Sequence, residues 1–250
     1  MTTFSRNRIL LLTLTIGLLL SCRAQQRGRT RPEVGAASIM SVLSKTHASG
    51  SLEYWGDCHI GVLPDFPRLK TNVQAQGSPL ETLREIFADD PVMRINTDAK
   101  GRIRMVESDV PEDLLEVRIK RVSFAPESEF PWEVENAVTG RSVGLYSPAD
   151  ALRHILSTPE VVNFRKAHSI GPFDFEQTGG PDLEISAPSP HISGELTDVK
   201  LSEALDSVLT VFPGIWIYEN CPSTKSARDV YFQFYQNASA WDALQTGKRY

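Results

Sequence analysis

The feature that most constrains the fold of this chain is a weak internal repeat. Residues 69–106 and 191–235 follow the same order: an extended stretch, a helix and two strands. A constant offset of 122 residues places Pro91 on Pro213 and keeps the strand that follows each proline in register. Because such a repeat predicts one supersecondary unit used twice, we expect an α+β fold with two small βαββ units, whose antiparallel hairpins pack on helices.

Local signals support both copies. In the first, Ser78 and Pro79 followed by Glu81 are typical of a helix start with a capping box. Turn-forming residues at 98–101 then predict a hairpin. In the second, the helix is expected to begin at Leu201. The predicted strands are 92–97 and 102–107 in the first copy, and 215–219 and 230–235 in the second.

One stretch of the second copy resembles a known family. Residues 197–205, Thr-Asp-Val-Lys-Leu-Ser-Glu-Ala-Leu, are similar to the point where a strand enters the helix in secretin and TonB short N-terminal domains. The equivalent residues 78–83 of the first copy depart from that pattern and match in element order and spacing only. The resemblance implies a compact βαββ module that makes protein–protein contacts in the periplasm, with no catalytic residues to transfer.

The N-terminus predicts export. Arg6 and Arg8 precede an apolar run at 9–20, the order of a secretory signal peptide, and the run is shorter than the ~20 residues that span a bilayer. The sequence Leu-Leu-Ser before Cys22 resembles the lipobox of bacterial lipoproteins, which implies that Cys22 becomes a lipidated N-terminus on the periplasmic side of the envelope. The alternative is cleavage near Ala24, with Cys22 discarded and the protein secreted.

Charge and composition then divide the rest of the chain. The whole sequence holds 26 Lys and Arg against 31 Asp and Glu, and removing the leader deletes two arginines, which leaves a net charge of −7. Such an acidic domain is a poor partner for nucleic acid. The expected organisation is signal peptide 1–21, lipidated tether 22–32, first α+β unit 33–122 with an N-terminal helix at 33–46, connector 123–190 with a helix at 147–157, second βαββ unit 191–236, and C-terminal tail 237–250.

Two cysteines remain if Cys22 carries a lipid. In an oxidising compartment, Cys58 and Cys221 are then candidates for a disulfide that joins the start of the folded part to its end. The alternative is two free, buried thiols.

Motifs for catalysis or metal binding are weak in this sequence. Residues 140–144 satisfy G-x-S-x-G, but the predicted helix begins several residues too late for a nucleophile elbow. Cys58 and His59 are adjacent, so on an extended chain they point to opposite faces, and no second ligand lies at zinc spacing. The acidic residues are interpreted as a solvated surface. We therefore expect a non-enzymatic protein without metal or cofactor.

Aromatic residues are the remaining candidates for partner binding. Trp132, Trp216 and Tyr218 lie in or near predicted strands and could form an exposed platform, although core packing explains most strand aromatics. The favoured hypothesis is a lipoprotein that binds or scaffolds an envelope protein complex. The alternative is an envelope hydrolase or glycan-processing enzyme with an unrecognised active site.

Overall fold

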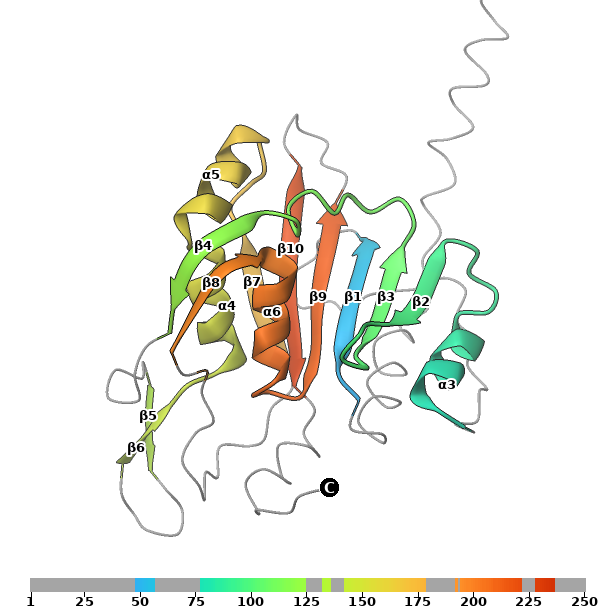
Figure 1. The fold of residues 1–250 in the computed structure, drawn as a ribbon, viewed down its shortest axis with the longest axis horizontal. Helices are drawn as coiled ribbons and strands as arrows, with labels where there is room; N and C mark the ends of the chain where they lie inside the picture. Colours follow the sequence, from blue (N-terminus) through green and yellow to red (C-terminus); the bar gives the residue numbers. More distant parts are fainter. Residues whose placement is uncertain are drawn as a thin grey trace, which may run out of the picture. The chain divides into compact units, whose positions relative to one another are not determined.

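The protein is an α+β structure with a mixed sheet (Figure 1). The computed structural model describes residues 48–56, 77–124, 132–135, 142–178, 192, 194–221 and 228–236. Within these ranges a six-stranded sheet has the order β2-β3-β1-β9-β10-β7, and two smaller antiparallel pairs are β4-β8 and β5-β6. The strands are β1 (Gly50–Trp55), β2 (Met93–Thr97), β3 (Ile103–Glu107), β4 (Arg118–Ser123), β5 (Trp132–Glu135), β6 (Ser142–Leu145), β7 (Asp174–Thr178), β8 (Glu195–Lys200), β9 (Gly214–Cys221) and β10 (Asp229–Gln236). The helices are α3 (Pro79–Ile86), α4 (Pro148–Leu156), α5 (Pro159–Ala167) and α6 (Leu201–Leu209).

Strand β1 joins two hairpins into one sheet. The β2-β3 and β9-β10 pairs are antiparallel, and β1 lies between β3 and β9, parallel to both. The register places Ser51 beside Arg104 on one side and beside Trp216 on the other. Residues paired in this way share a face of the sheet. The side chains that meet at the β1 junction therefore come from distant parts of the chain.

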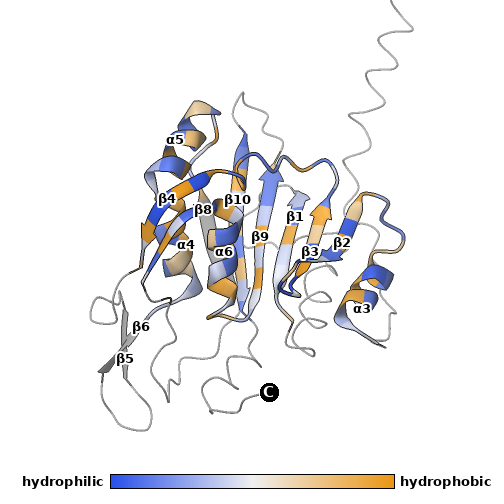
Figure 2. Ribbon diagram, in the orientation of Figure 1, coloured by the Kyte–Doolittle hydropathy of each residue, from blue (hydrophilic) through white to orange (hydrophobic). Residues whose placement is uncertain are grey.

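Alternation along the strands produces two hydrophobic clusters on opposite faces of the sheet. Along β9, Trp216 and Tyr218 belong to one cluster, whereas the alternating residues Ile215 and Ile217 belong to the other. Helices α4 and α6 contribute to the first cluster, and α3 contributes Leu83 and its neighbours to the second. Figure 2 shows the mixed apolar and polar bands that this alternation produces along β9, β1 and β3.

Helices α3 and α6 begin 122 residues apart, the offset expected from the sequence. At α3, the Glu81 carboxylate accepts from the backbone N–H of Ser78 at 3.0 Å, and the Ser78 hydroxyl accepts from the N–H of Glu81. At α6, the Glu203 carboxylate accepts from the backbone N–H of Lys200 at 2.8 Å. Each acid satisfies an N–H that the helix leaves unpaired at its first turn. The predicted starts of both helices are confirmed.

Other expectations differ from the structure in the connector. The connector 123–190 is predicted to hold one helix at 147–157, and the structure shows that helix as α4 but also places strands β5, β6 and β7 and helix α5 in the connector. Helix α5 follows α4 directly. Thr158 is its N-cap residue, and Pro159 is its first helical residue. The predicted helix 33–46 and extended stretch 69–75 lie outside the described residues. Among the helices that are described, none has the length and apolar character needed to cross a membrane.

Candidate functional site

A charged cavity of about 370 Å³ is lined by residues of β1, β3, the β2-β3 turn, the segment 108–117 and helix α6. Helix α6 packs on β9, and the next strands carry polar side chains on the same face: Glu53 from β1 and Arg104 from β3. Asp206 and Glu203 of α6 form one wall. The cavity is therefore built by elements of both halves of the sheet.

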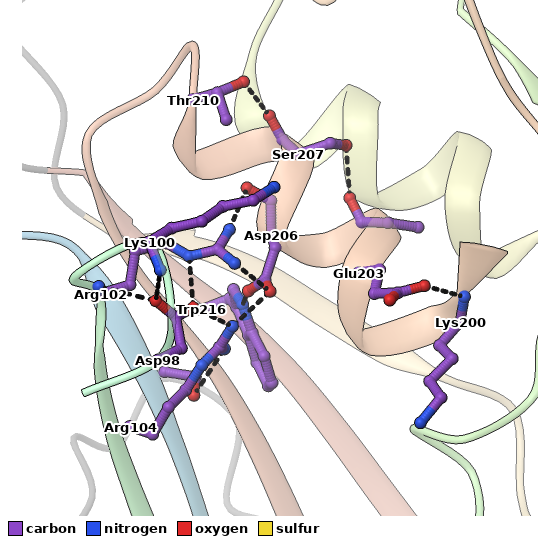
Figure 3. Close-up of polar contacts among 12 residues, drawn as sticks. Asp98, Lys100, Arg102, Arg104, Lys200, Glu203, Asp206, Ser207, Thr210 and Trp216 are labelled. Atoms are coloured by element: carbon purple, nitrogen blue, oxygen red, sulfur yellow. Dashed lines mark hydrogen bonds and ion pairs between the residues drawn. The ribbon is translucent and has the colours of Figure 1, made fainter. Parts of the chain in front are cut away.

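Two arginines and two aspartates form the centre of this site (Figure 3). Asp98, at the β2-β3 turn, accepts from Arg102 Nε at 2.7 Å and from Arg104 Nη2 at 3.1 Å. Asp206 accepts from Arg102 Nη2 at 2.8 Å and also from Arg104 Nη2. The guanidinium groups thus connect the β2-β3 turn to helix α6, across more than 100 residues of sequence.

Buried neighbours hold this cluster in place. The indole Nε1 of Trp216 donates to the second oxygen of Asp206 at 3.0 Å, and the guanidinium of Arg104 lies 5.6 Å from the centre of the Trp216 ring. Arg104 also donates to the Ser51 hydroxyl at 3.0 Å. Burial alone would lower the pKa of Arg104, but its hydrogen bond and charge interaction with Asp206, together with Asp98, raise it. The Arg104 guanidinium therefore keeps its charge beside these carboxylates.

Asp98 also organises the turn that carries the arginines. Its carboxylate accepts from the backbone N–H groups of Lys100 at 2.8 Å and Arg102 at 2.9 Å. Burial would raise the pKa of Asp98, but these hydrogen bonds and the Arg102 guanidinium outweigh it and hold the pKa at about 2. The turn is thus shaped by the same carboxylate that anchors the arginine pair.

Glu53 lines the cavity and is only 6% exposed. Its one described hydrogen bond comes from the Ser51 hydroxyl, to Oε1, at a long 3.4 Å. Burial and, next, the charge of Glu112 raise the pKa of Glu53 to about 7, while Arg104 opposes the shift. A carboxyl group with a strongly shifted pKa in a cavity is a candidate for binding or catalysis.

The rim of the cavity comes from the segment 108–117 and from the start of α6. Trp55 Nε1 donates to the carbonyl of Asp109 at 3.0 Å, and the Tyr218 hydroxyl donates to the carbonyl of Pro111 at 3.1 Å. These two contacts hold the segment over the ends of β1 and β9. On the rim, Lys200 Nζ and the Glu116 carboxylate form an ion pair at 2.6 Å.

The aromatic candidates from the sequence lie elsewhere. Trp216 and Tyr218 are fully buried, so they cannot form an exposed platform, because alternation on β9 turns both toward the core under α6. The indole of Trp216 instead donates a hydrogen bond to the Asp206 carboxylate. Burial raises the pKa of Tyr218 to about 12, so its phenol stays neutral. Trp132 is the first residue of β5, a strand described by its backbone pairing alone, and its exposure stays a prediction.

The cysteine predictions fall largely beyond the described residues. Cys22 and Cys58 lie outside them. Cys221 is the last residue of β9 and is buried. Both the lipid on Cys22 and the pairing of Cys58 with Cys221 therefore stay predictions.

The catalytic motifs of the sequence do not acquire the context they need. Ser142 begins strand β6, whereas a nucleophile elbow requires a helix directly behind the serine. His154 Nδ1 lies 3.3 Å from the carbonyl of Ser123, and His168 Nδ1 lies 2.9 Å from that of Phe164. In the part of the chain that the structure describes, no group of His, Cys, Asp and Glu side chains could hold a metal ion.

Sequence reasoning did not single out any residue of the charged cavity. Asp98 was identified only as a turn former, and Glu112 was interpreted as surface. A usable signal was present in the repeat itself, because the 122-residue offset places Asp206 on Arg84. Each side chain contacts the hairpin that follows its own helix. Arg84 donates to the carbonyl of Ile95 at 3.1 Å, and Asp206 accepts from the indole of Trp216 at 3.0 Å. The change from a positive charge at Arg84 to a negative charge at Asp206 is therefore a difference between the two copies that the sequence alone shows.

Comparison of this chain with protein-family models, with curated proteins and with solved structures found no match.

Proposed function

We propose that this protein is an exported envelope lipoprotein that acts as a non-enzymatic binding or scaffolding module for an envelope protein complex. Its signal peptide and the lipid on Cys22 place it on the periplasmic side of a membrane. Its folded part contains two βαββ units that resemble secretin and TonB short N-terminal domains. The matching helix starts of α3 and α6, each followed by an antiparallel hairpin, support this description.

One observation carries the proposal: the charged groups at the junction of the two hairpins are used to hold shape. Arg102 and Arg104 each contact both Asp98 and Asp206, so two positively and two negatively charged side chains pair with one another. A nucleophile in an active site needs a free base within hydrogen-bond reach, and the described part of this cluster offers an ion-paired frame instead. Such a frame favours a preformed surface for a partner.

The experiment that tests the proposal is photocrosslinking in living cells. Lys100 lies exposed on the β2-β3 turn at the rim of the cavity, so p-benzoylphenylalanine at this position should crosslink the partner. Glu85, exposed on α3, is the control position because it does not line the cavity. We expect a discrete adduct with an envelope protein from position 100 and none from position 85. Equal patterns at both positions, or no adduct at either, would contradict the proposal.

The alternative, an envelope hydrolase or glycan-processing enzyme, is favoured by Glu53. A carboxyl group whose pKa is about 7 suits general acid catalysis at neutral pH. Purified protein incubated with cell-wall glycan fragments discriminates between the two functions. Turnover that Glu53→Gln abolishes would support the enzyme and exclude the binding module as the main function.

A further inference from the structure

The cavity is more negative than its ion pairs can balance. Six carboxylates line it, from Glu53, Asp98, Glu112, Glu116, Glu203 and Asp206, against four cations, from Lys100, Arg102, Arg104 and Lys200. The two arginines neutralise the two aspartates, and Lys200 pairs with Glu116. Glu53, Glu112 and Glu203 remain against Lys100, so the cavity carries two excess negative charges when Glu53 is ionised and one when Glu53 is protonated.

Glu53 is the carboxylate of the cavity to which a ligand could donate a hydrogen bond or supply a positive charge. It is buried to 6% exposure, it lines the cavity, and within the described residues no cation lies at ion-pair distance from it. The contact with the Ser51 hydroxyl uses Oε1 only, so Oε2 is left without a described donor. Buried carboxylates in this state are costly unless a donor or a positive charge arrives.

The neighbours of Glu53 define the sign of that ligand. The charges facing it are Glu112 from the segment 108–117, Asp206 from α6 and Arg104 from β3. An anionic ligand would compete with Asp206 for the arginines, and Asp206 is buried and also held by Trp216. A cation instead needs no existing contact to break. It would also screen the repulsion between Glu53 and Glu112.

We propose that the cavity binds a basic side chain, the lysine ammonium or arginine guanidinium of the partner protein, in contact with Glu53 and Glu112. This inference rests on the proposed binding function and names the chemistry of the partner. The cavity volume, about 370 Å³, lies within the size range of ligand sites and accommodates one such side chain. Charge-assisted hydrogen bonds to a buried carboxylate then give specificity for basic residues.

The test is a titration of the full-length protein with N-acetyl-lysine amide, N-acetyl-arginine amide and methylamine, followed by NMR chemical shifts. N-acetyl-norleucine amide, which lacks the charge, and N-acetyl-glutamate amide are the controls. We expect saturable binding of at least one basic amide at pH 8, and at least tenfold weaker binding to Glu53→Gln. Glu112→Gln, on the rim, should weaken it severalfold without affecting the fold, whereas Glu85→Gln on α3 should leave it unchanged.

Each other outcome counts against the inference. Equal binding of norleucine and lysine amides, preference for the glutamate amide, or no binding of the basic amides would overturn it. Unchanged affinity in both Glu53→Gln and Glu112→Gln would also overturn it. If methylamine saturates the cavity and the basic amides bind no more tightly than methylamine, the ligand is a free amine, and the assignment to a partner side chain is overturned. If position 100 still crosslinks a partner while the basic amides fail to bind, the binding function stands and this inference alone falls.

Discussion

The carboxyl group of Glu53 makes stability depend on pH. Burial first, and the charge of Glu112 next, raise its pKa to about 7 from 4.5, so the native state holds its proton more tightly than the unfolded chain. Its stabilising contribution is therefore complete below about pH 4.5 and is lost as pH rises through about 7. Glu53→Gln keeps the neutral form at every pH. Relative to wild type, this variant should gain about 3 kcal/mol of unfolding free energy between pH 4.5 and pH 8.5.

Urea denaturation of both proteins at the two pH values measures this difference. Glu85→Gln serves as the control, because Glu85 is exposed on α3. A difference between Glu53→Gln and wild type that does not change with pH would show that Glu53 ionises normally in the native state.

Asp206 is expected to be the most sensitive charge of the cluster. Its side chain is buried and accepts from Trp216 as well as from Arg102 and Arg104. Asp206→Asn keeps an oxygen for the indole but leaves Asp98 as the one carboxylate that pairs with the two partly buried guanidinium groups in the described cluster. Breaking a buried ion pair from one side typically destabilises a protein by about 3 kcal/mol or more, and we expect that loss in urea denaturation at pH 7.

The matched control for Asp206 is Asp198→Asn. Asp198 pairs with Arg118 at 2.7 Å, but their side chains are 81% and 59% exposed. Exposed pairs contribute less than about 1 kcal/mol. Equal losses in the two variants would mean that the cluster at Asp206 contributes no more than a surface pair.

At the scale of elements, the sequence predicted what depends on near neighbours. The helix starts at Ser78 and Ser147 were found because capping boxes act over three residues, and both are present. Helix α5 was missed although Thr158 and Pro159 carry a similar start signal. Strand β7 was missed because it is short and its partner β10 follows more than 50 residues later. Local chemistry does not encode such distant, parallel pairings.

The charged cavity could not be predicted from the sequence for the same reason. Arg104 and Asp206 meet only because β1 lies between the two hairpins and sets their register. Glu53 gives no local sign of burial, since polar residues alternate with apolar ones on many half-exposed strands. The burial of Trp216 likewise depends on which face of β9 helix α6 covers. The contact between Arg104 and Asp206, the burial of Glu53 and the burial of Trp216 all depend on the order of strands in the sheet, which neither repeat specifies by itself.

The pairing of β1 with β9 favours the predicted disulfide between Cys58 and Cys221. Trp55 lies beside Asn220, and the N–H of Gly56 donates to the carbonyl of Asn220 at 2.9 Å. Gly56 therefore lies beside the strand end that carries Cys221, and Cys58 follows Gly56 by two residues in the sequence. We expect a bond that stabilises the fold by roughly 3 to 5 kcal/mol, since it closes a long loop.

A peptide map of protein from the periplasm, prepared without reductant, tests the pairing. The expected result is one linked peptide that contains Cys58 and Cys221 and separates on reduction. Free alkylation of both thiols without reductant would show that the two cysteines are unpaired and that the alternative of buried thiols holds.

At the scale of the whole molecule, the described six-stranded sheet consists of two halves that β1 joins. Strand β1 pairs with β3 of the first hairpin and with β9 of the second, and separate hydrophobic clusters lie on its two faces. The arginine–aspartate cluster adds a polar connection between the halves at one face. A partner bound in the cavity would therefore contact both halves at once. The proposed binding would thus depend on the integrity of the sheet junction.

The proposed lipid on Cys22 would determine where in the cell the proposed binding surface lies. A lipid there would hold the acidic protein at a membrane surface by its acyl chains, through the tether 22–32. Metabolic labelling with an alkyne fatty acid should mark the wild type, and the protein should fractionate with membranes. Cys22→Ser should abolish the label and release the protein, because no acceptor thiol remains at the end of the leader. Cys58→Ser is the matched control and should keep both the label and the membrane association. An unlabelled wild type recovered wholly in the soluble fraction would instead support cleavage near Ala24 and a secreted protein.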